Sequence, residues 1–310
     1  MKILIIDEMH PSIMSLLEER GFEADYKPKI TREEILGTVH EYDGLIIRSK
    51  TPMDEELLAK ASKLKFIGRA GAGLDKIDLD YIDKHNIKLY HAPEGNRDAV
   101  GEHAVAMLLS LFNNLKKADA EVRKGIWDRE GNRGEELQGK TIGVFGYGNM
   151  GKAFAKRMSG FGVRVLAYDK YLENYGDEYA EQATFQELQE QAEVLSIHVP
   201  LTPETRGFFS EEVMAGFHHP FYLINTARGE VILLQTLVSA LKKGTLKGAL
   251  LDVLENEKLK TLDESQRAAF EELVTREDVM FSPHIAGWTF QSYEKINQVL
   301  VDKINSGFGA

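Results

Sequence analysis

Residues 141–151 read Thr-Ile-Gly-Val-Phe-Gly-Tyr-Gly-Asn-Met-Gly, and a second aliphatic run, 163–168, follows and ends in Asp169. The first five residues predict a buried strand, and the chain from Gly151 to about Gly160 predicts a helix. The run 163–168 predicts a second strand. A Gly-x-Gly-x-x-Gly sequence between a strand and a helix is typical of dinucleotide-binding domains.

Each glycine of this motif has a physical role. Gly146 allows a tight turn, Gly148 lets backbone amides approach a pyrophosphate, and Gly151 allows close packing of helix on strand. Asp169 lies roughly 20 residues beyond the motif, where a carboxylate accepts hydrogen bonds from the adenosine ribose. Because this carboxylate would repel a 2′-phosphate, the sequence predicts NAD rather than NADP. The alternative, a strand–turn–helix with incidental glycines, fits the flanking strands less well.

The alternation of strands and helices extends in both directions from this motif. Downstream, further strands are predicted at 194–198, 222–225, 248–252 and 279–281. With the first two, they make six parallel strands, as in the full dinucleotide-binding fold. Upstream, strands are predicted at 2–6, 23–26, 45–47, 65–67 and 89–91, which suits a flavodoxin-like domain. The predicted fold class is therefore α/β, with two doubly wound parallel-sheet domains and a cleft between them.

Helix signals indicate where the domains meet. One helix is predicted to begin at Thr31, with a capping box, and another at Thr51-Pro52. Residues 98–124 predict one long helix, and 289–308 predict a final helix that returns to the first domain. We therefore expect a discontinuous substrate domain, 1–97 plus 285–310, and an NAD-binding domain, 98–284.

Composition excludes several classes of function. The 310 residues include no cysteine, which excludes disulfides, thiolate metal sites and cysteine nucleophiles, and we expect no metal. The net charge of −11 argues against nucleic acid or an anionic membrane as the main partner. The chain has no signal-peptide pattern and no apolar run long enough to span a bilayer. We expect a cytoplasmic protein that binds a small anion through a few arginines.

Three polar segments follow predicted strands of the second domain, namely Asn225–Gly229, Asp252–Glu257 and Ser282–Gly287. Ligands of open α/β sheets bind at this end of the strands. Taken singly, each segment has an ordinary structural explanation. Together they suit oxidation of a 2-hydroxy acid, which needs a base such as histidine and a planar cation for the carboxylate. The nicotinamide would accept the hydride.

At this point the chain resembles the D-isomer-specific 2-hydroxyacid dehydrogenases, over essentially its whole length. The matching segments occur in the family's order and spacing: the glycine motif, His198-Val199-Pro200-Leu201-Thr202-Pro203-Glu204-Thr205, Asn225–Gly229, Asp252–Glu257 and His284–Gly287. The resemblance implies that Arg228 binds and polarises the substrate, that His284 is the acid/base, and that Glu257 is its partner. Where the family has proline after this glutamate, the chain has Lys258, so the loop 258–262 is expected to differ. Glu255 is an alternative partner.

The resemblance also implies the residues that contact NAD. The set combines the glycine motif and Asp169 with residues at later strand ends: Gly146, Tyr147, Gly148, Asn149, Met150, Gly151, Asp169, His198, Pro200, Thr205, Thr226, Ala227, Arg228, Asp252, His284 and Gly287.

The first domain carries a second set of candidate residues. Gly68-Arg69-Ala70-Gly71-Ala72-Gly73-Leu74-Asp75 and Arg48-Ser49-Lys50-Thr51 follow neighbouring strands, so both arginines are expected at one sheet edge, facing the cleft. Asn96 opens the long helix. Loops that simply need small residues, and a helix cap, are the alternative explanations. The substrate-binding candidates are Arg48, Ser49, Arg69, Gly71, Ala72, Gly73, Asn96, Arg228 and His284.

Within the family, these two loops look most like those of 3-phosphoglycerate dehydrogenases, which open serine synthesis by oxidising 3-phosphoglycerate to phosphohydroxypyruvate. An extra arginine suits a substrate with a phosphate. The chain ends at Ala310, so no carboxyl-terminal regulatory domain is expected. Two alternatives stay open: a glyoxylate, hydroxypyruvate or other 2-ketoacid reductase, and an NAD-sensing binding protein with little turnover. A homodimer through the helix near 98–124 is expected, with plain packing of this helix as the alternative.

Overall fold

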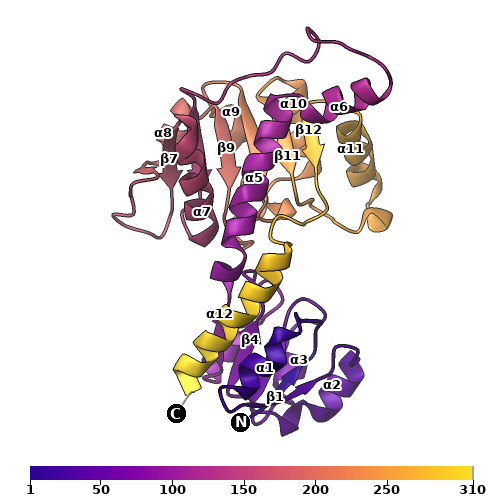
Figure 1. Ribbon diagram of the computed structural model, residues 1–310, viewed down its shortest axis with the longest axis vertical. Helices are drawn as coiled ribbons and strands as arrows, with labels where there is room; N and C mark the ends of the chain where they lie inside the picture. The colour runs from indigo at the N-terminus through magenta and orange to yellow at the C-terminus, as the bar shows by residue number, and fades with distance from the viewer. Residues whose placement is uncertain (309–310) are drawn as a thin grey trace. The chain divides into compact units, whose positions relative to one another are not determined.

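The computed structural model describes residues 1–308, and these fold as two compact units (Figure 1). Unit 1 comprises Met1–Arg97 together with the chain from Trp288 onward, and unit 2 comprises Asp98–Gly287. The return to unit 1 therefore falls at Trp288 rather than at residue 285. Each unit is a parallel sheet with helices on both faces, which confirms the predicted fold class.

The sheet of unit 1 has five parallel strands in the order β2-β1-β3-β4-β5. This is the flavodoxin-like order. The strands are β1 (Lys2–Ile5), β2 (Glu23–Tyr26), β3 (Gly44–Ile47), β4 (Phe66–Arg69) and β5 (Lys88–His91). All five lie where the sequence predicts them. Strands β1 and β3 are almost entirely buried, because helices cover both faces of the sheet.

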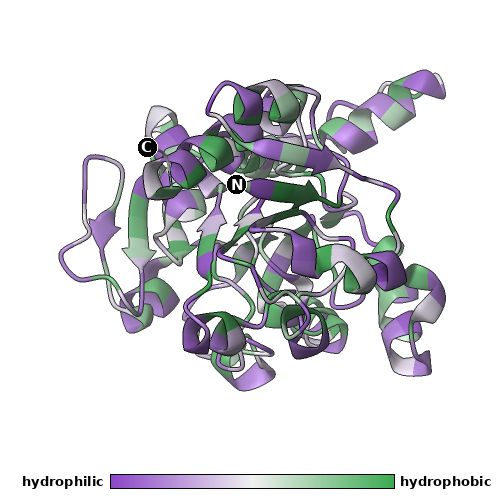
Figure 2. Cartoon of the chain, turned by 90° about the horizontal axis from the view of Figure 1, so that it is seen from below, coloured by the Kyte–Doolittle hydropathy of each residue, from purple (hydrophilic) through white to green (hydrophobic). Residues whose placement is uncertain are grey.

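Two layers of helices cover this sheet. On one face α1 (Ser12–Glu18) and α12 (Phe290–Phe308) pack on Ile3, Ile5, Ile46 and Phe66. On the other face α2 (Arg32–Thr38), α3 (Glu55–Leu58) and α4 (Leu79–Lys84) pack on Leu4, Leu45, Ile47 and Ile67. The final helix thus belongs to the core of unit 1, as predicted. Figure 2 shows helices in which hydrophilic and hydrophobic residues lie side by side, as expected for helices with one buried face.

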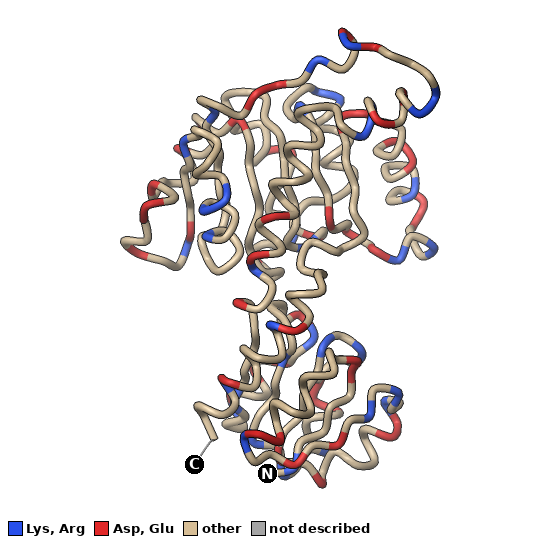
Figure 3. Tube along the Cα trace, in the orientation of Figure 1, with Lys and Arg blue, Asp and Glu red and all other residues tan. Residues whose placement is uncertain are grey.

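The sheet of unit 2 has seven parallel strands in the order β12-β11-β10-β9-β6-β7-β8. The strands are β6 (Thr141–Phe145), β7 (Arg164–Tyr168), β8 (Glu181–Gln182), β9 (Val194–Ile197), β10 (Phe221–Asn225), β11 (Leu246–Leu251) and β12 (Val279–Phe281). The order reverses between β6 and β9, so the glycine motif after β6 stands at the switch point where this fold binds nucleotides. In Figure 3 the strands of both sheets carry few charged residues.

Helices cover both faces of this second sheet. One face is covered by α5 (Arg97–Phe112) and α7 (Asn149–Met158). Figure 1 shows α5 lying across the strands. The other face is covered by α8 (Phe185–Gln191), α9 (Glu211–Ala215), α10 (Leu234–Lys242) and α11 (Glu264–Val274).

The prediction of one long helix over 98–124 was wrong. The chain forms α5 and then a separate α6 (Leu115–Arg123), because Asn114 adopts the left-handed conformation, with φ of 49°. Asparagine tolerates this conformation and often ends helices. The two helices also differ in burial: α5 has eight buried residues and α6 has none.

Two smaller predictions also need correction. The helix predicted from Thr51-Pro52 begins at Glu55, because Asp54 caps it by accepting the backbone N–H of Leu57. Strand β8 was not predicted, since it has only two residues and both are exposed and polar. The capping box at Thr31 is confirmed. Within residues 1–308, no helix is long and apolar enough to cross a membrane.

Candidate functional site

The loop after β10 presents Arg228 and is shaped by a buried asparagine. The side chain of Asn225 accepts the backbone N–H of Ala227 at 3.0 Å and donates to the carbonyl of Arg228 at 2.9 Å. Asn225 is fully buried, so these bonds replace its contacts with water. The guanidinium of Arg228 in turn donates from Nη1 to the carbonyl of Ala227 at 2.7 Å. The sequence places Asn225 in the motif but does not reveal this bracing role.

Gly229 allows this loop to pack against the loop after β11. A Cβ built at Gly229 would lie 1.9 Å from the carbonyl carbon of Leu254 and 2.4 Å from the backbone nitrogen of Glu255. Any larger residue would push the two backbones apart. Glycine at this position therefore brings the loop of Arg228 directly against the loop that carries Glu257.

Asp252 anchors the loop that carries His284. Its carboxylate is buried and accepts the backbone N–H groups of Ile285 and Ala286, both at 2.9 Å, and its carbonyl accepts the N–H of His284 at 2.7 Å. His284 has φ of 55°, in the left-handed region that non-glycine residues adopt at a cost of about 1–3 kcal/mol. The bonds to Asp252 hold the loop in this conformation. Asp252 was predicted to contact the cofactor; its carboxylate is already committed to the protein.

Two further residues extend this anchor, and the sequence did not reveal their roles. The hydroxyl of Ser282 donates to the carboxylate of Asp252 at 2.6 Å and lies 2.8 Å from Nε2 of His103. Since the Ser282 proton goes to Asp252, the Nε2–H of His103 donates to Ser282. This places a residue of α5 behind the loop of His284. His103 is far away in the sequence, so no local pattern could connect the two.

The side chains of His284 and Glu257 form a close pair, which is an ion pair when His284 is protonated. Nδ1 of His284 lies 2.7 Å from Oε1 of Glu257. The hydrogen bond to Glu257 raises the pKa of His284, whereas burial and the positive charge of Arg228 oppose this shift. Because Glu257 takes Nδ1, the proton that His284 can exchange with another molecule is the one at Nε2. The His284 side chain is 46% exposed, so this nitrogen is accessible to a small molecule.

Glu255, the alternative partner of His284, has a structural position instead. One of its carboxylate oxygens accepts the backbone N–H of Leu234 at 2.9 Å, at the start of α10, and the other accepts Nε2 of Gln266 at 2.8 Å. Lys258, which departs from the family pattern, donates its backbone N–H to the side chain of Asn256 at 3.0 Å. Proline has no N–H and could not make this bond. The backbone N–H of Lys258 thus holds the start of the loop 258–262.

The glycine motif has the geometry of a nucleotide-binding turn. Gly146 has φ of 97°, and a Cβ built there would lie 2.8 Å from the carbonyl oxygen of His198. A Cβ at Gly151 would lie 2.1 Å from the carbonyl oxygen of Gly146, whereas one at Gly148 would meet nothing within 4 Å. The first and last glycines are thus required by the fold, and Gly148 leaves open space at the start of α7.

Asp169, which follows β7, holds the turn of the glycine motif through hydrogen bonds. Its carboxylate accepts the backbone N–H groups of Tyr147 at 2.8 Å, Tyr171 at 3.0 Å and Leu172 at 3.1 Å. A carboxylate held at this point fits a ribose and repels a second phosphate. A second observation also fits a dinucleotide: the hydroxyl of Thr226 is buried with no hydrogen-bond partner in the protein. The residues present therefore fit the predicted NAD.

Three other predicted cofactor residues direct their side chains into the protein. The ring of Tyr147 is fully buried and its hydroxyl donates to Asp177 at 2.7 Å. His198 packs on Phe154, and burial lowers its pKa to about 3, so it is neutral. Thr205 donates to the carbonyl of Pro200 at 2.7 Å. These contacts shape the turns of the site.

In unit 1, the two predicted arginines lie at the same edge of the sheet. Arg69 is the last residue of β4 and pairs with Ile47 of β3, and Arg48 follows Ile47 directly. Because side chains alternate along a strand, the two arginines point to opposite faces. Nη1 of Arg69 donates to the carbonyl of Ala70 at 2.8 Å. The guanidinium of Arg48 lies over the ring of Trp288. The sequence predicted that both arginines lie at one edge of the sheet, but not that they point to opposite faces.

The other predicted residues of unit 1 lie in the loops beside these arginines. Gly71 has φ of 131°, and the guanidinium of Arg69 fills the place where a Cβ would stand. The carbonyl of Ala72 contacts the His91 ring at 3.2 Å, and Ser49 is exposed. Asn96 has a buried side-chain oxygen with no partner, which leaves it available to a ligand. In the described part of the chain, no group of three or more His, Asp or Glu side chains could hold a metal ion.

Comparison with known proteins agrees with this geometry. Residues 105–286 match the family model described as "D-isomer specific 2-hydroxyacid dehydrogenase, NAD binding domain". The D-3-phosphoglycerate dehydrogenase of Methanocaldococcus jannaschii is 34% identical over 98% of this chain and 56% of its own length. That of Bacillus subtilis is 37% identical over 83% of this chain and 49% of its own length. The chain thus spans about half the length of the curated relatives it matches.

A solved structure covers nearly the whole chain. The D-lactate dehydrogenase of Aquifex aeolicus, complexed with NAD and lactic acid, superposes with a TM-score of 0.83 at 29% identity, over 99% of this chain and 95% of that one.

Proposed function

The chain belongs to the D-isomer-specific 2-hydroxyacid dehydrogenase family, and from this premise we propose that it transfers a hydride between a D-2-hydroxy acid and NAD. The observation that carries the proposal is the 2.7 Å pair between His284 and Glu257, with Arg228 on the adjoining loop. The pair supplies a proton, and Arg228 supplies a planar cation. Both lie in the unit that carries the glycine motif.

In this proposal each side chain has a distinct role. Arg228 binds the substrate carboxylate through two parallel N–H donors and polarises the 2-oxygen. During oxidation, Nε2 of neutral His284 takes the proton of the 2-hydroxyl, and during reduction the imidazolium returns a proton to the 2-keto oxygen. Glu257 accepts the Nδ1–H of His284 and stabilises the imidazolium. NAD supplies the hydride acceptor, which no side chain can provide.

We propose 3-phosphoglycerate as the hydroxy acid and phosphohydroxypyruvate as its product, which would place the reaction at the start of serine synthesis in the cytoplasm. Two observations support this choice. The curated relatives at 34% and 37% identity are D-3-phosphoglycerate dehydrogenases. In addition, Arg48 and Arg69 add positive charge at a ligand-binding sheet edge, where a phosphorylated acid needs more cations than a simple hydroxy acid does.

A single set of assays tests both parts of this proposal. The oxidation of NADH is followed with phosphohydroxypyruvate, hydroxypyruvate, glyoxylate and pyruvate under identical conditions. We expect the highest kcat/KM for phosphohydroxypyruvate. A preference for hydroxypyruvate or glyoxylate would show that the proposed substrate is wrong, but the proposed hydride transfer would stand. Negligible rates with every acid, together with tight NADH binding, would instead indicate an NAD-binding sensor.

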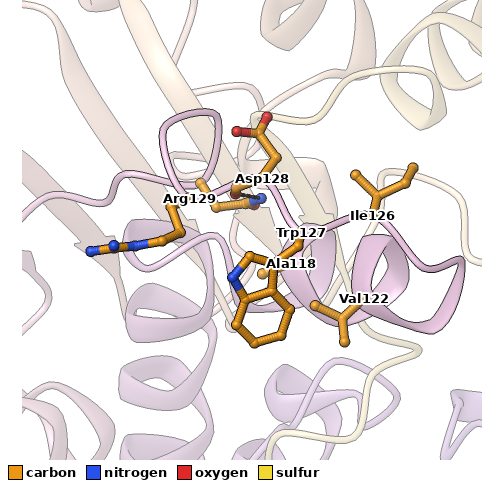
Figure 4. A pocket seen from close by; sticks show the side chains of 7 residues that line it. Ala118, Val122, Ile126, Trp127, Asp128 and Arg129 are labelled. Atoms are coloured by element: carbon orange, nitrogen blue, oxygen red, sulfur yellow. Dashed lines mark hydrogen bonds between the residues drawn. The ribbon is translucent and has the colours of Figure 1, made fainter.

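We also propose that the protein forms a homodimer through α6 and the loop that follows it. Helix α6 has no buried residue, and its neighbourhood exposes Leu115, Val122, Ile126 and Trp127, the last at 80%. Figure 4 shows Trp127 beside Ala118 and Val122, lining a hollow of about 290 Å³. A second copy is the partner that covers such a surface in most soluble oligomers. The proposed contact lies at α6 rather than at α5, because eight residues of α5 are already buried and none of α6 is.

Mass measurement in solution tests this dimer. We expect twice the chain mass for the unaltered protein and a monomer for Trp127→Asp, because a buried carboxylate in an apolar contact is costly. Glu130→Ala is a matched control, since Glu130 is an exposed charge in the same loop, paired with Arg133. An unaltered mass for Trp127→Asp would contradict the proposed contact.

A further inference from the structure

Arg48 is stacked on two aromatic rings of unit 1. Its guanidinium carbon lies 4.4 Å from the centre of the Trp288 ring and 5.3 Å from that of Tyr293. The two rings are 5.1 Å apart, and His10 packs edge-on against Tyr293 at 5.6 Å. A guanidinium that stacks on rings keeps the N–H donors at its edge free, because stacking uses only its face. The plane of these donors is therefore set by Trp288 and Tyr293.

The charge of Arg48 has no carboxylate partner among residues 1–308. Its guanidinium donates from Nη1 to the carbonyl of Glu8 at 3.3 Å and also donates a hydrogen bond to the hydroxyl of Tyr293. The nearby carboxylate of Asp7 accepts the backbone N–H of Arg48 at 2.6 Å. Other arginines of unit 1 behave differently: Arg20 pairs with Asp302 at 2.6 Å, and Arg32 pairs with Asp54 at 2.7 Å. In a chain with a net charge of −11, an arginine kept out of ion pairs is free to bind an anion.

The position of Arg48 also fits a ligand site. It follows β3, and its bond to Asp7 joins this loop to the one that follows β1. These are two adjacent carboxyl ends of a doubly wound sheet, where ligands of this fold bind. Trp288 is 52% exposed, which is high for a ring of its size and leaves this edge open.

We propose that Trp288 and Tyr293 hold Arg48 as a receptor for a phosphate group, and that Trp288 thereby determines the preference for a phosphorylated substrate. Trp288 and Tyr293 are positioning residues, because they act through Arg48. The inference rests on the proposed function only in taking a 2-hydroxy acid as the substrate. Its ligand chemistry is a phosphate dianion, either inorganic phosphate or a phosphomonoester, bound by two parallel N–H donors.

A spectroscopic experiment tests the receptor without requiring catalysis. The chain has two tryptophans, so Trp127→Phe leaves Trp288 as the sole source of tryptophan emission. This variant is titrated with inorganic phosphate at constant ionic strength, adjusted with potassium chloride. We expect a saturable change in emission, which is lost when Arg48→Ala is added. Arg20→Ala is the matched control, because Arg20 lies in the same unit but pairs with Asp302. An unchanged saturation curve with Arg48→Ala would overturn the receptor.

Kinetics then test whether Trp288 sets the preference. Trp288→Ala frees the Arg48 side chain, and ordering such a side chain again costs about 0.5–1.5 kcal/mol, or roughly 2- to 12-fold in affinity. We therefore expect KM for phosphohydroxypyruvate to rise by this factor with kcat nearly constant, and KM for hydroxypyruvate to stay the same. Trp288→Phe keeps a ring and should restore KM to within about twofold. Equal changes for both acids would overturn the inference.

The two experiments separate this inference from the proposed function. If no keto acid is reduced but the emission of Trp288 still saturates with phosphate through Arg48, the proposed function fails and the receptor stands. If phosphohydroxypyruvate is reduced efficiently but emission responds neither to inorganic phosphate nor to a phosphomonoester, the proposed function stands and the receptor is overturned. A response to the phosphomonoester but not to inorganic phosphate would identify the substrate itself as the ligand and would support the inference.

Discussion

In unit 2, a buried carboxylate fastens the loop of His284, whereas in unit 1 two partly exposed rings hold Arg48. Asp252 follows β11 and Arg48 follows β3, so both residues lie at the carboxyl ends of parallel strands. Asp252 binds its neighbours through several short hydrogen bonds, which fix a strained backbone. Stacking on Trp288 and Tyr293 restrains a side chain and leaves the backbone unstrained. The difference suits two tasks: proton transfer needs atoms placed within a few tenths of an ångström, and charge recognition tolerates more freedom.

We expect the largest effect on turnover from replacing His284, the side chain presented by the loop that Asp252 holds. We expect His284→Ala to lower kcat by ~10²-fold or more, as loss of a general acid/base does, while NADH binding is retained. Single-turnover rates and NADH fluorescence titration measure the two quantities separately. Turnover equal to that of the unaltered protein would remove His284 from the reaction.

Arg228→Lys should have the next largest effect. A lysine keeps the charge but cannot supply two parallel donors, and a lost charge-assisted hydrogen bond costs about 1.5–3 kcal/mol. We therefore expect kcat/KM to fall by roughly 10- to 100-fold. Arg206→Lys is a suitable control, since this arginine follows the Thr205 turn and is not part of the three loops. Kinetics like those of the unaltered protein would show that Arg228 does not contact the substrate.

Asp252→Asn tests whether the hydrogen bonds of the Asp252 carboxylate hold the loop of His284 in place. The amide presents N–H donors to groups that are themselves donors, namely the Ser282 hydroxyl and the backbone N–H groups of Ile285 and Ala286. We expect a loss of about 1–3 kcal/mol in the free energy of unfolding, together with reduced turnover. Denaturant titration measures the first quantity. Ser282→Ala removes one donor and should cost less. Equal stability of Asp252→Asn and the unaltered protein would contradict the anchoring role.

The smallest predicted change is a shift in pH dependence. The pKa of His284 is raised by its hydrogen bond to Glu257, so Glu257→Gln should lower it. Reduction of a keto acid needs the imidazolium, and its rate therefore falls as pH rises through this pKa. In Glu257→Gln this decline should occur at a lower pH, which a pH–rate profile measures. A Glu255→Gln profile serves as control, because Glu255 binds Leu234 and Gln266 instead.

The same pair links stability to pH. The folded-state pKa of His284 lies above the ordinary value of about 6.5, so folding favours the protonated ring. The stabilisation is complete below that pH and is lost as pH rises through the folded-state pKa. In Glu257→Gln the folded-state pKa of His284 should be lower, so this stabilisation should be smaller and its loss should be complete at a lower pH.

Most strands of both sheets were predictable from the sequence because they are short, largely apolar runs separated by amphipathic helices, whereas the polar two-residue β8 was not. The break between α5 and α6 was missed, although Asn113-Asn114 is a helix-ending signal, because apolar periodicity continues past it. The partner of His284 could not be chosen from the sequence, since Glu255 and Glu257 differ by two positions in one loop. The structure distinguishes the two glutamates. The backbone of Glu255 packs against Gly229, and its carboxylate accepts the N–H of Leu234 at the start of α10.

Long-range contacts were beyond sequence reasoning. His103 meets Ser282 only because α5 crosses the sheet beside β12, and Trp288 reaches Arg48 only because α12 returns to unit 1. In both cases the residue types are unremarkable on their own, and the fold creates the contact.

The left-handed backbone of His284 has a consequence for engineering. Glycine adopts φ near 55° without cost, so His284→Gly would remove the local strain together with the imidazole. A directed-evolution campaign that selects only for heat resistance would therefore be drawn toward this position and would accumulate inactive but sturdier variants. A screen for a thermostable catalyst should hold residue 284 constant and seek its gains on distant surfaces.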